Sequence, residues 1–120
     1  MGGEISWHVE LRVRPGQLGN FLTLTSEMVA VTRREPGVLS YQRFVSEDGT
    51  TVHAYERYAD SAAAVAHLEV FAKHFAGRFS AMVERKTFTV FGDPSAELKA
   101  VLDSFNAMYL KPFGDLEYWA

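Results

Sequence analysis

The order of strand and helix patterns along this chain predicts an α+β fold. Apolar and polar residues alternate in the first segment, and helical apolar stripes follow at residues 18–32 and in the region 61–83. A hairpin signal, Asp48-Gly49, separates two β-rich segments between those helices. The resulting order, β-α-β-β-α-β, is that of the ferredoxin-like, split βαβ fold, with helices on one face of an antiparallel sheet. In that topology the strands lie in the order 4-1-3-2.

The first strand is predicted over residues 5–14, where every second residue is apolar. Pro15-Gly16 ends it. The next segment has the spacing of an amphipathic helix, with one stripe made of Leu18, Phe21, Leu22, Thr25, Met28, Val29 and Thr32. Arg33 and Arg34 suit the negative end of the helix dipole, and Pro36-Gly37 end the helix.

The hairpin and the second half of the fold follow. Residues 38–46 and 51–58 are rich in β-branched and aromatic residues. Asp60 is predicted to cap a helix over about residues 61–70. A second helical run then continues to Val83, and residues 86–91 are predicted as the fourth strand.

An extra helix and an aromatic tail are predicted after the fourth strand. Asp93 and Pro94 have the character of an N-cap and a first helical residue. The helix should bury a stripe made of Leu98, Val101, Leu102, Phe105, Met108 and Tyr109. The tail adds Phe113, Tyr118 and Trp119. We therefore expect one domain over residues 1–92, and a C-terminal unit over residues 93–120 that packs on it or on a partner subunit.

Composition limits the classes of function. A chain of 120 residues with 48% hydrophobic and 22% charged residues is typical of one soluble globular domain. The net charge of −3 and the lack of a Lys/Arg run give no support for nucleic-acid binding. The absence of cysteine excludes disulfides and thiolate chemistry. With no signal-peptide pattern and no membrane-spanning apolar stretch, we expect a cytoplasmic protein without membrane contact.

Apolar side chains fall on both faces of the predicted sheet. Phe44, Val45 and Tyr55, for example, do not segregate to one face with the other apolar residues. Helices cover only one face, so the other face needs a second cover. A symmetric homodimer that pairs sheet to sheet would supply it, and the C-terminal helix is the alternative.

The histidines are candidates for proton transfer near neutral pH. On one helix, His67 and His74 would lie about 10.5 Å apart along its axis, too far to share a metal ion with bonds of about 2.1 Å. No metal site is therefore expected, and each is either a proton carrier or a surface or core-edge residue. His8 and His53 lie on neighbouring strands, where we expect no direct contact. His8 belongs either to a polar cluster on its strand or to a pocket.

Several aromatic residues lie on the predicted central strands. They are Trp7, Tyr41, Tyr55 and Tyr58. Such residues form either part of the core or the wall of a cavity for a planar apolar ligand.

Four short motifs occur in order along the chain, namely EPGVLSY at residues 35–41, Glu56-Arg57-Tyr58, Ala66-His67-Leu68 and His74-Phe75. With these motifs the chain resembles the antibiotic biosynthesis monooxygenase family. The likeness covers about residues 5–92. It implies a homodimer of ferredoxin-like subunits, a dimeric α/β barrel, with a cavity between the sheet and helices of each subunit. Members of this family are described as oxygenating phenols or quinone precursors without metal or flavin.

The resemblance implies a cofactor-independent monooxygenase that acts on a small aromatic or quinone-type molecule. It makes His67 or His74 the catalytic base, and Tyr58, Tyr41 and His8 substrate-binding residues. The same fold also serves as a non-catalytic ligand-binding or stress-response module and as a haem-degrading monooxygenase, which are the alternatives.

The chain departs from the family pattern in three places. Tyr58 stands where many relatives have Trp, and two extra residues lie between His67 and His74. His74 thereby falls about one residue, roughly 100° around a helix, from the histidine of haem-binding relatives, which argues against haem. The segment from Asp93 onward exceeds the minimal domain.

Overall fold

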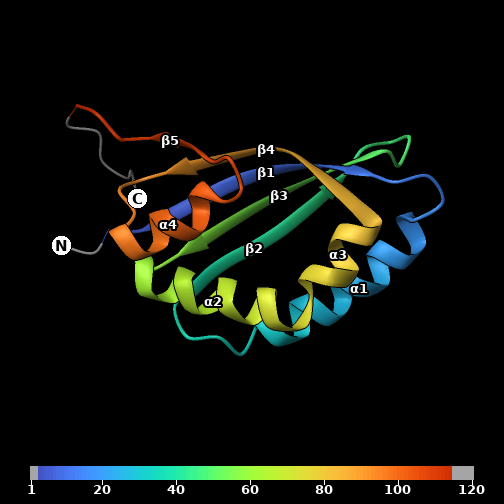
Figure 1. Ribbon diagram of the computed structural model, residues 1–120, viewed down its shortest axis with the longest axis horizontal. Coiled ribbons are helices and arrows are strands. Elements are labelled where there is room, and N and C mark those ends of the chain that lie inside the picture. Colours follow the sequence, from blue (N-terminus) through green and yellow to red (C-terminus); the bar gives the residue numbers. More distant parts are fainter. Residues whose placement is uncertain (1–2, 115–120) are drawn as a thin grey trace, which may run out of the picture.

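A computed structural model describes residues 3–114 of the chain and has the predicted order of elements through the fourth strand (Figure 1). The first half contains β1 (Ile5–Val13), α1 (Leu18–Thr32), β2 (Val38–Val45) and β3 (Thr51–Tyr58). The second half contains α2 (Ser61–His74), α3 (Ala76–Met82), β4 (Val83–Phe91), α4 (Ala96–Asp103) and β5 (Met108–Leu110). No helix in these residues is long and apolar enough to cross a membrane.

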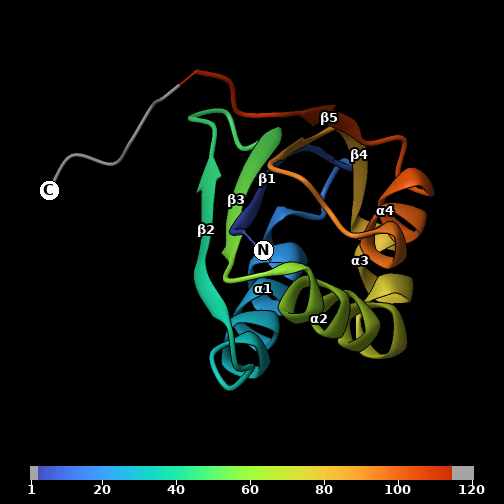
Figure 2. The same ribbon diagram turned by 90° about the vertical axis from the view of Figure 1, so that its left-hand side faces the viewer.

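The sheet has the order β2-β3-β1-β4-β5. The strands β1 to β4 pair antiparallel, so the predicted order 4-1-3-2 and the ferredoxin-like α+β fold are confirmed. Figure 2 shows the helices gathered on one side of this sheet, with the other side of the sheet uncovered. The strand β5 adds to the free edge of β4 in parallel orientation.

Alternation along the central strands builds the core. In β1 the residues on the helix side are buried, namely Ile5, Trp7, Val9, Leu11 and Val13. In β3 the helix side carries Val52, Ala54, Glu56 and Tyr58, all buried. Because side chains on a strand point alternately to opposite faces, the remaining residues of both strands face away from the helices. One charged residue, Glu56, therefore lies on the buried face.

The helix α2 begins where Asp60 caps it, as predicted. The carboxylate of Asp60 accepts a hydrogen bond from the Ala63 N–H at 2.9 Å. The helix buries Ala64, His67, Leu68 and Phe71, which recur at one helical stripe. It extends to His74, and α3 then ends at Met82, so β4 starts at Val83, three residues before the predicted position.

The predicted start and end of the C-terminal helix are both wrong. The N-cap is Ser95, whose hydroxyl accepts from the Leu98 N–H, and not Asp93. The helix α4 ends at Asp103, and Asn106 adopts a left-handed φ of 56° that reverses the chain. Residues 108–110 then pair with β4, because the open edge of that strand offers backbone hydrogen-bond partners that a longer helix would leave unused.

The described part of the C-terminal unit packs on its own domain. Leu98 and Leu102 are fully buried, and α4 lies against α2. Phe105 stacks on Phe88 of β4 with ring centroids 5.4 Å apart. Phe113 is 85% exposed. Tyr118 and Trp119 lie outside the described residues.

Candidate active site

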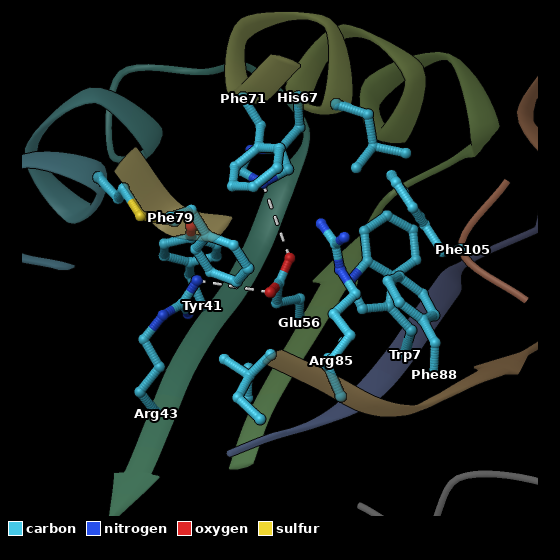
Figure 3. Close-up of a pocket in the computed structure, with 15 residues that line it drawn as sticks. Trp7, Tyr41, Arg43, Glu56, His67, Phe71, Phe79, Arg85, Phe88 and Phe105 are labelled. Carbon is cyan, nitrogen blue, oxygen red and sulfur yellow. Dashed lines mark hydrogen bonds and ion pairs between the residues drawn. The ribbon is translucent and has the colours of Figure 1, made fainter. Parts of the chain in front are cut away.

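A small cavity of about 40 Å³ lies between the sheet and the helices (Figure 3). Aromatic and apolar side chains form most of its wall, including Trp7, Met28, Phe71, Phe79, Phe88 and Phe105. Three charged side chains and one histidine also line it, namely Arg43, Glu56, Arg85 and His67. Charged groups in an apolar enclosure interact more strongly than in water, which makes this cavity the candidate active site.

Two carboxylates converge on the buried imidazole of His67. The Nδ1 atom of His67 lies 2.7 Å from Oε1 of Glu35. Its Nε2 atom lies 3.7 Å from Oε1 of Glu56, on the other side of the ring. Because a carboxylate only accepts hydrogen bonds, the short contact assigns a proton to Nδ1 and directs the lone pair of Nε2 toward Glu56.

The loop between α1 and β2 brings Glu35 to this position. Gly37 has a φ of 83°, a conformation that favours glycine, and it sits against α2. A Cβ atom at Gly37 would lie 2.7 Å from the Cβ of Ala63. The small residues at both positions therefore allow the loop to approach α2 closely enough for Glu35 to reach His67.

Two neighbours hold the carboxylate of Glu56. The hydroxyl of Tyr58 donates a hydrogen bond to Oε1 of Glu56 at 2.5 Å, and Nη2 of Arg43 lies 3.5 Å from Oε2. Burial, reinforced by the charge of Glu56, raises the pKa of Tyr58 well above its ordinary value. The Tyr58 hydroxyl therefore stays protonated and keeps Glu56 oriented.

Tyr41 forms the side of the cavity next to His67. Its ring meets the imidazole edge-on with centroids 5.2 Å apart, and the guanidinium carbon of Arg43 lies 3.6 Å from the Tyr41 ring centroid. Burial, and then the charge of Glu56, raises the pKa of the Tyr41 hydroxyl. Tyr41 is therefore a neutral group that can only act as a hydrogen-bonding or packing residue near neutral pH.

Two buried polar atoms have no hydrogen-bond partner among residues 3–114, Oε2 of Glu35 and Nη1 of Arg43. Native proteins satisfy most buried polar atoms, so such exceptions call for an explanation. Since Arg43 lines the cavity, its spare N–H group is suited to an oxygen atom of a ligand.

The arrangement is suited to accepting a proton from a bound molecule. His67 can take the proton on Nε2, and the imidazolium that forms lies between two carboxylates. The contact of Nδ1 with Glu35 orients the ring, and Nε2 is the nitrogen that remains to accept a proton. Within the described part of the chain, no group of three or more His, Asp and Glu residues is placed to hold a metal ion.

The structure brings only some of the predicted site residues together. His67 and Tyr41 line the cavity, whereas Tyr58 lies behind it and contacts it through Glu56. His74 is exposed at the end of α2, where its backbone carbonyl accepts a hydrogen bond from Arg78. His8 faces the uncovered side of the sheet and does not line the cavity.

The expectation that His8 and His53 do not touch is wrong. Their Nε2 and Nδ1 atoms are 2.8 Å apart, and the rings stack with centroids at 5.0 Å. In the register of β1 and β3, His8 lies opposite Tyr55 and His53 lies opposite Glu10. The two histidines are thus diagonal neighbours on one face, a separation that long side chains can bridge.

Sequence reasoning missed Glu35, Arg43, Glu56 and Arg85 as site residues. No carboxylate cluster is visible along the sequence, yet two carboxylates flank His67. One signal was available, because Glu56 shares a face of its strand with Val52, Ala54 and Tyr58. A charge on an apolar face of a central strand is costly unless it is paired, and so indicates a function.

The chain is similar to known proteins in both sequence and structure. A sequence model of the family described as antibiotic biosynthesis monooxygenase matches residues 5–85. No curated protein matches the chain. MupZ from Pseudomonas fluorescens is similar in structure with a TM-score of 0.85 at 19% identity, covering 98% of this chain and 91% of MupZ.

Two further structures are similar over the main domain. SnoaB, a cofactor-independent oxygenase from Streptomyces nogalater, gives a TM-score of 0.65 at 18% identity over 78% of this chain and 96% of SnoaB. Protein SO0527 from Shewanella oneidensis gives a TM-score of 0.62 at 24% identity over 75% of this chain and 88% of its own. These likenesses support the fold, and the family match spans more than half of the sequence. The chain belongs to the antibiotic biosynthesis monooxygenase family.

Proposed function

We propose that this protein is a cofactor-independent monooxygenase-like enzyme that oxidises a small aromatic or quinone-type substrate in the cavity. The observation that carries the proposal is the buried Glu35–His67–Glu56 arrangement, which provides a base at an apolar wall. Family membership supports an oxygenase, and SnoaB is a cofactor-independent oxygenase of the same fold.

In the proposed reaction, His67 removes a proton from an acidic phenol or from a CH₂ group flanked by aromatic rings. The resulting anion is electron-rich and reduces O₂ itself, and the oxygen adduct then loses water. For a CH₂ group the balance is R₂CH₂ + O₂ → R₂C=O + H₂O, so the substrate supplies both electrons for the water oxygen. The spare N–H of Arg43 would stabilise the substrate oxyanion, as preorganised donors do in apolar sites.

The roles of the predicted site residues follow this scheme. His67 is the base, Tyr41 packs beside the substrate, and Tyr58 acts as a positioning residue through Glu56. We assign no catalytic role to His74 or substrate contact to His8, because both lie away from the cavity.

The haem-degrading alternative is less well supported by the geometry. An axial ligand needs a free imidazole nitrogen that faces open space. His74, the residue nearest in sequence to the haem-binding histidine of relatives, lies at an exposed helix end outside the cavity. The non-catalytic binding module differs from our proposal in one respect, since it predicts ligand binding without turnover.

Oxygen uptake with anthrone and 1-naphthol in metal-free buffer tests the proposed function. We expect His67→Ala to lower the catalysed rate by about 100-fold or more, since a positioned base contributes roughly 10²–10⁴-fold. His74→Ala is the matched control and should retain the wild-type rate, because that side chain is exposed. Ligand binding without oxygen uptake by the wild type would instead support the non-catalytic module.

We further propose that the protein is a cytoplasmic homodimer whose uncovered sheet faces pack together. Large apolar side chains on that side are exposed, with Phe44 at 58%, Phe91 at 38%, Met108 at 59% and Leu110 at 44%. A shallow groove there is lined by Phe44, Tyr55, Phe91 and the His8–His53 pair. An apolar face of this kind suits a self-complementary interface. The lack of cysteine is consistent with the cytoplasm.

Sedimentation velocity tests the dimer. Phe44→Glu places a charge on the uncovered face, and we expect it to convert the dimer to a monomer at micromolar concentration. Leu22→Glu is the control, because Leu22 is 51% exposed on α1 and should leave the dimer intact. A wild type that sediments as a monomer at all concentrations would contradict this arrangement.

A further inference from the structure

Arg85 is a half-buried cation that the proposed reaction does not use. It comes from β4 and lines the cavity next to Phe105, as Figure 3 shows. Its guanidinium carbon lies 4.2 Å from the ring centroid of Phe105, 5.2 Å from that of Phe79 and 5.7 Å from that of Phe71. No residue in the described range 3–114 forms a hydrogen bond or an ion pair with it.

The three phenyl rings leave the hydrogen-bonding capacity of the Arg85 guanidinium unused. They attract its positive charge through their π faces, but they offer no oxygen acceptor for its five N–H donors. Burial lowers the pKa of Arg85, which reflects the cost of holding this charge away from water. Removing a charge from water is unfavourable unless it is paired, so the site favours a ligand that brings an anionic oxygen.

The other charges of the cavity are already compensated locally. Arg43 lies beside Glu56, and His67 lies against Glu35. Arg85 is attracted electrostatically to Glu56, but Arg43 and Tyr58 already hold that carboxylate, so the N–H donors of Arg85 remain available to a ligand. A single planar guanidinium matches a planar monoanion, and a carboxylate can accept two parallel N–H bonds from it.

Arg85 also stands at the boundary between the cavity and an outer groove. A groove of about 330 Å³ is lined by residues of α2, α3 and α4, and it opens beside the exposed residues Ala72, Ser80 and Ser104. Five residues line both spaces, namely Leu68, Phe71, Phe79, Arg85 and Phe105, and we call Arg85 and the three phenylalanines the threshold subsite. The groove has the volume of a small-molecule site, and the inner cavity of about 40 Å³ holds only part of such a molecule, so a substrate would occupy both spaces.

We propose that the threshold subsite binds the carboxylate of a substrate that is otherwise aromatic or apolar, with Arg85 as the anion-binding residue. The substrate enters through the groove, and its carboxylate is held by Arg85 while its ring contacts the three phenyl groups. Phe105 lies outside the residues matched by the family, so the C-terminal segment contributes a wall of this subsite. The inference names a substrate class for the proposed oxygenase and in that respect rests on the proposed function.

Calorimetric titration of the full-length protein with 1-naphthoate and its neutral analogue 1-naphthamide tests this subsite. We expect the wild type to bind naphthoate at least tenfold more tightly than naphthamide. Arg85→Gln should raise the Kd for naphthoate at least tenfold and change that for naphthamide by less than twofold. Arg78→Gln is the matched control and should change neither, because Arg78 pairs with Glu27 on the surface.

Two further variants keep the test decisive. Arg85→Lys retains the charge without the planar fork, so it should recover part of the preference for naphthoate, and its thermal melt reports folding independently of Arg85→Gln. Phe105→Ala should weaken both probes equally. Equal affinity for the two probes in the wild type, no binding of either at millimolar concentration, or an unchanged preference in Arg85→Gln would overturn the proposal.

The binding experiment tests the anion subsite separately from the proposed oxygenase function. If the preference for naphthoate depends on Arg85 but no substrate gives oxygen uptake, the result supports the anion subsite and contradicts the oxygenase. Oxygen uptake that depends on His67, together with equal binding of the two probes, would do the reverse.

Discussion

Replacing Glu56 by Gln is expected to lower the catalysed oxygen uptake by about 100-fold with little change in the shape of the site. The amide oxygen can still accept the hydrogen bond from Tyr58, but the negative charge beside Nε2 of His67 is lost. The positive charge that develops on the ring during proton transfer then has no carboxylate beside Nε2, so the transition state is less stabilised. Rates of oxygen uptake at saturating anthrone, compared between the wild type and Glu56→Gln, measure the effect.

Glu69→Gln provides the matched control, since Glu69 is exposed on α2 close to His67 in sequence. It removes the same charge without touching the cavity, and it should retain the wild-type rate. Equal rates for the wild type and Glu56→Gln would exclude Glu56 from the chemistry and leave His67 with Glu35 alone.

The second large effect concerns stability. Leu102→Ala is expected to lower the free energy of unfolding by about 2–5 kcal/mol, the range for removing a fully buried leucine side chain. Leu102 is fully buried on α4, beyond the residues matched by the family. A loss of this size in one cooperative transition would mean that the C-terminal unit unfolds together with the main domain. Urea unfolding followed by circular dichroism measures it.

Leu22→Ala serves as the comparison, because Leu22 is 51% exposed on α1 and should change the free energy of unfolding by less than about 0.5 kcal/mol. If Leu102→Ala produced a separate early transition and left the main one unchanged, the C-terminal unit would be an independently unfolding segment. Residues 1–92 and 93–120 would then unfold as two separate units.

The C-terminal stripe illustrates where periodicity misleads. Its apolar residues from Leu98 to Tyr109 fit one long helix, but the helix ends at Asp103. Asn106 reverses the chain, and the next residues pair with the free edge of β4. Helical spacing alone cannot reveal an available strand edge, because that edge exists only after the sheet has formed.

For the two helix histidines, too, periodicity predicts their spacing but not their burial. Helix geometry correctly separates His67 from His74, since both lie on the continuous helix α2. It does not tell which of them is buried. That depends on α2 directing His67 toward the sheet, while the loop after α1 approaches closely enough for Glu35 to contact it.

The sequence by itself determined the order of the elements through β4 and the ferredoxin-like topology, because local periodicity, capping and turn residues act over short distances along the chain. The motifs between Glu35 and Phe75 indicated the family. Only the tertiary structure decided the site. Glu35, Glu56 and His67 come from a loop, a strand and a helix, and Arg85 and Phe105 from β4 and the segment after α4. Contacts between such distant residues are set by sheet register, by the close approach at Gly37 and by the turn at Asn106, none of which a periodic pattern encodes.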